Sequence, residues 1–209
     1  MTQPTYYPIQ LKTGEAIGLP RVSHVLNHIN KHGFAGKRIY YGKSNGKAIE
    51  IGNQVDAMIT RIIDGTIMPT EEWQGITKEE WLLTDEKVKN SVRAYIRWQQ
   101  QTGFKPRFSH MIVYSLKHGY AGELDAGGLI KNRMVICDWK TGDLHFDLQV
   151  MQLVAYLYAY LEMYPKKKAS EIRLVLLSKK TGNFQDITID SENMQKAFSK
   201  FLEYKSYVL

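Results

Sequence analysis

Two aspartates and a lysine in the second half of the chain could together carry out metal-assisted chemistry. Asp125 lies in one predicted strand, and Asp138 lies at the end of the next, with Lys140 two residues later. Residues that face each other on neighbouring strands lie about 5 Å apart, so the two carboxylates could share a hard cation such as Mg²⁺. The Lys140 ammonium would emerge on the same strand face and could stabilise charge that develops on phosphorus. Two acids and one lysine placed in this way would suffice for metal-assisted hydrolysis of phosphodiesters.

A bare Asp-x-Lys pair is more often a solvated strand end than a catalytic site. The surrounding residues decide between these two interpretations. Gly-x-x-Asp at 122–125, apolar-x-Asp-Trp-Lys-Thr at 136–141 and a helix with Gln152 and Tyr156 follow in this order. The combination resembles the RecB-like branch of the PD-(D/E)XK nuclease superfamily, including its phage-type exonucleases. The resemblance implies that Asp125, Asp138 and Lys140 are catalytic and that the two aspartates bind Mg²⁺, for which Mn²⁺ would substitute.

The helix motif has an ordinary explanation as well. Gln152 and Tyr156 are four residues apart and share one helix face, where the resemblance implies substrate binding. Packing of an apolar helix would explain the pair equally well. Gln149, one turn earlier on nearly the same face, is a competing candidate.

Two further positions enter through the same resemblance. Gly52-Asn53-Gln54-Val55-Asp56 is similar to the family's Gly-x-x-x-His motif, whose histidine is an additional metal ligand. Asp56 replaces the histidine with an oxygen donor suited to Mg²⁺ or Mn²⁺, although an idle surface aspartate fits as well. His110 stands where relatives often carry a glutamate and is a candidate site neighbour, whereas a lone strand histidine is more often structural.

Charge and composition fit this interpretation without proving it. The 209 residues include 28 Lys+Arg and 21 Asp+Glu, a formal charge of +7, which favours a polyanionic partner. No apolar run is long enough for a transmembrane helix, and the first residues lack a secretory pattern. Cys137 is the one cysteine, which excludes an intrachain disulfide. A cytoplasmic protein without membrane association is expected.

The predicted elements form an α/β protein. Helices are expected over 21–31, 49–63 and from Thr84 or Asp85 to 102, before a meander of antiparallel strands over 108–116, 120–129 and 133–138. A helix over 147–163, strands over 171–178 and 184–189, and a last helix capped by Ser191 follow. We expect a single domain over 1–209, with a mainly helical part over 1–105 and a catalytic core over 106–209. The resemblance implies a restriction-endonuclease-like core, with a mixed central sheet flanked by helices.

One segment invites a different interpretation. Gly42-Lys43-Ser44 would suggest a phosphate-binding loop, but the glycine that this motif needs at position 37 is Lys37. An ATPase is therefore disfavoured. The basic and aromatic residues over 37–47 could instead track phosphates, and a simple solvated loop is at least as consistent.

The expected function is that of a Mg²⁺-dependent deoxyribonuclease, an exonuclease of DNA processing, recombination or repair. A structure- or site-selective endonuclease of the same fold is the alternative. A nucleic-acid-binding module without catalysis is a third interpretation, motivated by Asp56 and His110. The expected partner is single- or double-stranded DNA, and a homo-oligomer or a separate helicase or recombination partner stays open.

Overall fold

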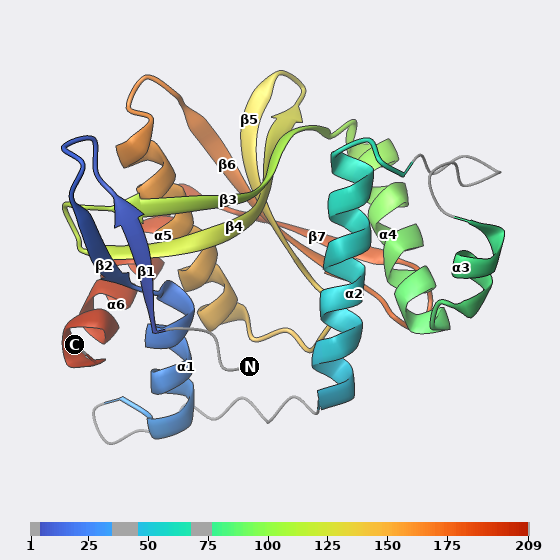
Figure 1. Cartoon of the computed structure of the whole chain (residues 1–209), viewed down its shortest axis with the longest axis horizontal. Helices are drawn as coiled ribbons and strands as arrows, with labels where there is room; N and C mark the ends of the chain where they lie inside the picture. The colour runs from blue at the N-terminus through green and yellow to red at the C-terminus, as the bar shows by residue number, and fades with distance from the viewer. Residues whose placement is uncertain (1–4, 35–45, 68–76, 209) are drawn as a thin grey trace.

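The computed structural model describes residues 5–34, 46–67 and 77–208 (Figure 1). Most of the basic segment over 37–47 lies outside these ranges. Within the described ranges, no helix is both long and apolar enough to cross a membrane.

A five-stranded sheet forms the centre of the molecule, with the order β3-β4-β5-β6-β7. Its strands are β3 (Lys105–Ser115), β4 (Tyr120–Ile130), β5 (Arg133–Lys140), β6 (Ala169–Leu177) and β7 (Phe184–Ile189). Neighbours are antiparallel except β5 and β6, which are parallel and are joined through a helix. The sheet is therefore mixed, and its first three strands form the predicted meander.

Helices cover both faces of the sheet (Figure 1). On one face lies α5 (Phe146–Met163), with α1 (Val22–His32) and α6 (Ser191–Val208) packed against it. On the other face lie α2 (Gly46–Ile63) and α4 (Glu86–Thr102), while the short α3 (Lys78–Leu83) precedes α4. Because α5 is enclosed between the sheet and two helices, it is apolar on nearly all sides.

Helix α4 shows why these residues form these elements. Val88, Val92, Tyr95 and Trp98 recur at helical spacing and are fully buried against the sheet and α2. The Asp85 side chain accepts a hydrogen bond from the Lys87 amide and caps the first turn. The helix ends at Gly103, whose φ of 67° is left-handed and suits glycine.

The described N-terminal part is mainly helical, but it begins with a hairpin that was not predicted. Strands β1 (Tyr6–Gln10) and β2 (Ala16–Pro20) form an antiparallel hairpin whose Tyr7, Ile9 and Leu19 pack on Ala121 of β4. Pro8, Gly18 and Pro20 obscure the strand pattern, because proline and glycine are rare inside sheets. They are tolerated here because the hairpin has only two strands.

Two element ends also differ from the prediction. Strand β5 continues through Lys140 and pairs with β6 along this stretch, instead of ending at Asp138. Asp190, not Ser191, caps α6, because its carboxylate accepts the Asn193 amide at 2.8 Å.

Strands β3 and β4 bend in the middle, as Figure 1 shows. Their pairing passes from Ser109–Ala126 to Met111–Leu124 and skips His110 and Asp125. Leu124 packs on the α5 face, whereas Ala126 packs on the face of α2 and α4. A regular strand would place both on one face, so the strand turns over at Asp125. His110, with a φ of 47°, lies at the same point of β3.

Candidate active site

Asp125 and Asp138 lie where β4 and β5 stop pairing. The antiparallel register ends at Ala126–Cys137, and its continuation by one residue places the two aspartates opposite each other. Beyond that point, the Asp125 carboxylate accepts a hydrogen bond from the Trp139 amide at 3.1 Å. Asp138 is 1% exposed, whereas Asp125 is only partly buried. Because β4 and β5 separate here, the two carboxylates lie together where the pairing of these strands ends.

Lys140 joins this pair to helix α5. Its Nζ lies 2.7 Å from Asp138 Oδ2 and donates a hydrogen bond to Gln152 Oε1 at 3.3 Å. The Gln152 amide in turn donates to the Tyr156 hydroxyl at 3.2 Å. Tyr156 is 4% exposed, whereas Gln152 is partly exposed. The buried hydroxyl therefore supports Gln152 from the interior of the protein.

The charges of this cluster strongly influence one another. Burial raises the pKa of Asp125 well above its usual range, and the Asp138 carboxylate adds to the effect. Burial also raises the pKa of Asp138, although Lys140 opposes this. Burial lowers the pKa of Lys140, but Asp138 and Asp125 more than offset it, so its pKa is raised. Lys140 is therefore protonated. A second cation would stabilise the charged forms of the two carboxylates.

Asp56 reaches the site from α2 through the indole of Trp139. Its Oδ1 accepts a hydrogen bond from Trp139 Nε1 at 3.0 Å, and its Oδ2 lies 3.3 Å from His110 Nε2. Gly52, one turn earlier, faces Thr141 Oγ1. The upstream motif is thus beside the Asp138–Thr141 segment, and Asp56 is 33% exposed.

His110 links Asp56 to a polar chain that ends in the N-terminal hairpin. Its Nδ1 lies 2.7 Å from Glu123 Oε1, and its Nε2 lies 2.8 Å from Thr60 Oγ1. The Tyr7 hydroxyl donates to Glu123 Oε2, and Arg21 donates to the Tyr7 hydroxyl at 2.7 Å. The left-handed backbone at His110 lets its ring enter this chain.

Three residues of this network were not predicted from the sequence: Trp139, Glu123 and Tyr7. Glu123 could have been found, because it stands two residues before Asp125 on the same strand. Tyr7 had no local signal, since it is 116 residues from its partner. Gln149 is not brought to the carboxylates: its amide donates to the Asp143 carbonyl, near the start of α5.

The donor set fits a hard divalent cation. Asp138 Oδ2 is buried and has no partner other than Lys140 among the described residues. Both carboxylates supply oxygen, and Mg²⁺ commonly takes one or two carboxylates and keeps several waters. Within the described ranges, no three His, Cys, Asp or Glu residues form a complete metal cluster. Two carboxylates suit an ion that keeps several waters of its own.

Comparisons with known proteins support the fold. No family model matches the sequence, and no curated protein matches it. A candidate exonuclease from Eubacterium rectale superposes with a TM-score of 0.56 at 12% identity, over 88% of this chain and 78% of that one. An alkaline exonuclease from Laribacter hongkongensis, LHK-Exo, matches with a TM-score of 0.34 at 11% identity, over 79% and 84% of the two chains. The first likeness confirms the predicted fold class, an α/β core with a mixed central sheet.

Proposed function

We propose that this protein is a metal-dependent deoxyribonuclease that hydrolyses phosphodiester bonds and acts as an exonuclease. The observation that carries the proposal is the set of contacts among Asp138, Lys140 and Gln152 at the point where β4 and β5 separate. Two carboxylates and a fixed ammonium group at one strand end suit phosphodiester hydrolysis.

Asp125 and Asp138 would hold Mg²⁺ or Mn²⁺. The bound ion would lower the pKa of its water and polarise a phosphoryl oxygen. Asp56, which touches Trp139 rather than the two aspartates, would orient the site through that indole.

Lys140 acts as an electrostatic group in this proposal. Because the neighbouring carboxylates keep it protonated, it can donate hydrogen bonds to a phosphoryl oxygen or hold the attacking water, but it cannot accept a proton. Gln152 fixes the direction of the ammonium group, and Tyr156 fixes Gln152. Burial raises the pKa of the Tyr156 hydroxyl, so the hydroxyl stays protonated while it serves as a support.

The choice of exonuclease over endonuclease has a different basis. It rests on the name of the Eubacterium rectale protein, a candidate exonuclease with the same fold. A closed circle decides between the two modes, because an exonuclease that needs an end cannot begin on it.

The test is cleavage of end-labelled linear DNA, single- and double-stranded, beside a closed circle, in Mg²⁺, Mn²⁺ or EDTA. We expect loss of the linear substrates only, and only with metal. Lys140→Ala should reduce the rate by roughly 100- to 1000-fold, as expected for loss of one transition-state donor. Asp138→Asn should abolish cleavage.

Lys168→Ala is the matched control, because Lys168 is an exposed lysine before β6, at the opposite end of β5 and β6 from Lys140. Its rate should equal that of the unmodified protein. Full activity of Lys140→Ala would contradict the mechanism. Nicking of the circle would show an endonuclease, and binding without cleavage would show a module that lacks catalysis.

A further inference from the structure

A cleft of about 660 Å³ opens directly beside Lys140. It follows the ends of β5 and β6 and the turn between β6 and β7, and Lys140, Thr141, Lys179, Lys180 and Phe184 are among its lining residues. Its described lining includes three lysines and a single acidic residue, Asp143. The cleft is therefore positively charged and continuous with the candidate active site.

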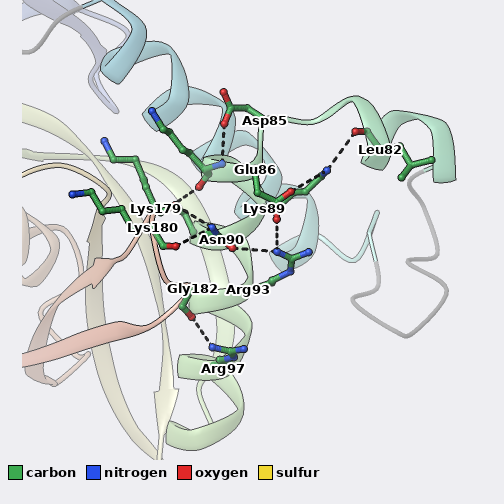
Figure 2. A network of polar contacts seen from close by, with 12 residues as sticks. Leu82, Asp85, Glu86, Lys89, Asn90, Arg93, Arg97, Lys179, Lys180 and Gly182 are labelled. Atoms are coloured by element: carbon green, nitrogen blue, oxygen red, sulfur yellow. Dashed lines mark hydrogen bonds and ion pairs between the residues drawn. The ribbon is translucent and has the colours of Figure 1, made fainter.

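The turn that carries two of these lysines is fixed by helix α4 (Figure 2). The Asn90 side chain donates to the carbonyl oxygens of Lys179 and Lys180 at 3.2 and 3.3 Å. Arg97 donates to the Gly182 carbonyl at 3.0 Å, where φ is +68° and a side chain would be strained. Only main-chain atoms of the lysines are used in these bonds.

The ammonium groups of Lys179 and Lys180 are thus left for another partner. Figure 2 shows both side chains extending away from the α4 residues that hold their carbonyl groups. Among the described residues, neither lysine forms an ion pair, whereas Lys89 and Arg93 nearby both pair with Glu86. Two lysines whose main chain is fixed beside a cleft, with no ion pair to a described acid, suit a polyanion.

The cleft is also lined by an aromatic side chain, and it runs from Lys140 toward Lys179 and Lys180. Phe184 lines it and is only partly buried, so its ring could stack on a base. Lys140 is the register partner of Leu176, and Lys179 follows three residues later, in the turn between β6 and β7. A strand with its scissile phosphate at Lys140 would therefore reach the two lysines with its neighbouring nucleotides.

We infer that this cleft binds the single DNA strand that flanks the scissile phosphate, with Lys179 and Lys180 on its phosphates and Phe184 on a base. Its volume of about 660 Å³ is that of a small-ligand pocket, which suits a few nucleotides of one strand. The inference deepens the proposed function and rests on it for the position of the scissile phosphate.

Binding in EDTA tests the cleft without cleavage. The probe is a fluorescein-labelled oligodeoxythymidine of about twelve nucleotides, which suits site sizes of 4–16 nucleotides, followed by anisotropy over a salt series. For Lys179→Gln/Lys180→Gln, the slope of log K against log salt should fall in magnitude by about 1.4, or about 0.7 for each phosphate that a lysine no longer neutralises. Phe184→Leu should weaken binding by roughly 5- to 100-fold, the loss of one base stack.

Lys167→Gln/Lys168→Gln is the matched control, because it removes the same charge at the opposite end of β5 and β6. Its slope should be unchanged. An equal loss of slope in both double variants would overturn the inference, because general charge would then explain the binding. Equally tight binding of a hairpin duplex without overhangs and of the single strand would also overturn the inference.

A parallel cleavage assay in Mg²⁺ separates the two proposals. If the unmodified protein cleaves DNA but the Lys179→Gln/Lys180→Gln slope is unchanged, the cleft inference is wrong and the proposed function stands. If the slope falls but no cleavage occurs in any metal, the cleft still binds the strand and the proposed function is wrong. Unchanged melting temperatures would establish that each variant is folded.

Discussion

The ring of Tyr156 occupies the space that a side chain at Gly122 would need. A Cβ atom at position 122 would lie 2.1 Å from Tyr156 Cε1, far inside contact distance. Gly122 opens the segment that leads to Asp125, and Tyr156 supports Gln152 at Lys140. Two sequence motifs that are far apart in the chain are therefore coupled through one contact.

Gly122→Ala should destabilise the fold and weaken the candidate site. The added methyl group must displace the buried ring, and overpacking of this kind costs about 1–3 kcal/mol. Urea denaturation would measure the loss. Gly46→Ala, where a Cβ atom meets nothing within 4 Å, should not lower stability. In a double-mutant cycle with Tyr156→Leu, the Gly122→Ala penalty should shrink, and an unchanged penalty would show that the clash is not its source.

Asp56→Asn should lower the affinity for Mn²⁺ without removing it. The substitution removes a negative charge that acts on both Asp125 and Asp138, although an amide oxygen can still accept from Trp139. Loss of such a supporting carboxylate typically costs about 10- to 100-fold in metal affinity. Isothermal titration calorimetry with Mn²⁺ would measure this. Asp138→Asn should abolish binding, and Glu50→Gln, on the exposed side of the same helix, should leave it unchanged. Complete loss in Asp56→Asn would instead identify Asp56 as a direct ligand.

Arg173→Met should be strongly destabilising. Arg173 pairs with Glu171 and, at 2.6 Å, with Asp186, which also accepts a hydrogen bond from Trp98 Nε1. Among the described residues, removal of the cation leaves Asp186 without an ion pair and Glu171 with only the exposed Arg133, at a cost of about 3–5 kcal/mol. Chemical denaturation would measure the free energy of unfolding. Arg133→Met removes an exposed partner of Glu171 and should cost less than about 1 kcal/mol. Equal losses would mean that burial does not govern this network.

Glu162 should contribute stability that disappears in acid. Burial alone would raise its pKa, but hydrogen bonds from the Ser115 hydroxyl and from the Lys117 and Leu116 amides lower it below the ordinary value. A group with a folded-state pKa below its unfolded value stabilises the protein above the unfolded pKa. That contribution is lost as pH falls from the unfolded value, about 4.3, through the folded one.

The measurement is the free energy of unfolding between pH 7 and pH 3, compared with Glu162→Gln. The variant should be less stable at pH 7, and the gap should close as the pH falls. A gap of constant size would show that the Glu162 charge does not stabilise the turn between β3 and β4.

The N-terminal hairpin could not be predicted from local sequence patterns. Five-residue strands that contain proline or glycine give little periodic signal, and their stability comes from packing on Ala121. The hydrogen bonds from Tyr7 through Glu123 to His110 could not be predicted either, because these residues come from separate parts of the sequence. Local periodicity carries no information about such contacts.

The sequence by itself determined the central strands, the main helices and the placement of Asp138 and Lys140 on one strand face. These follow from short-range rules, because strands repeat every two residues, helices every 3.6, and residues two apart share a strand face. Only the tertiary structure decided the bend at Asp125, where alternation fails between Leu124 and Ala126. It also decided how α4 holds the turn that carries Lys179 and Lys180 beside the site. Both depend on contacts between distant segments, which form only when the layers of the fold pack together.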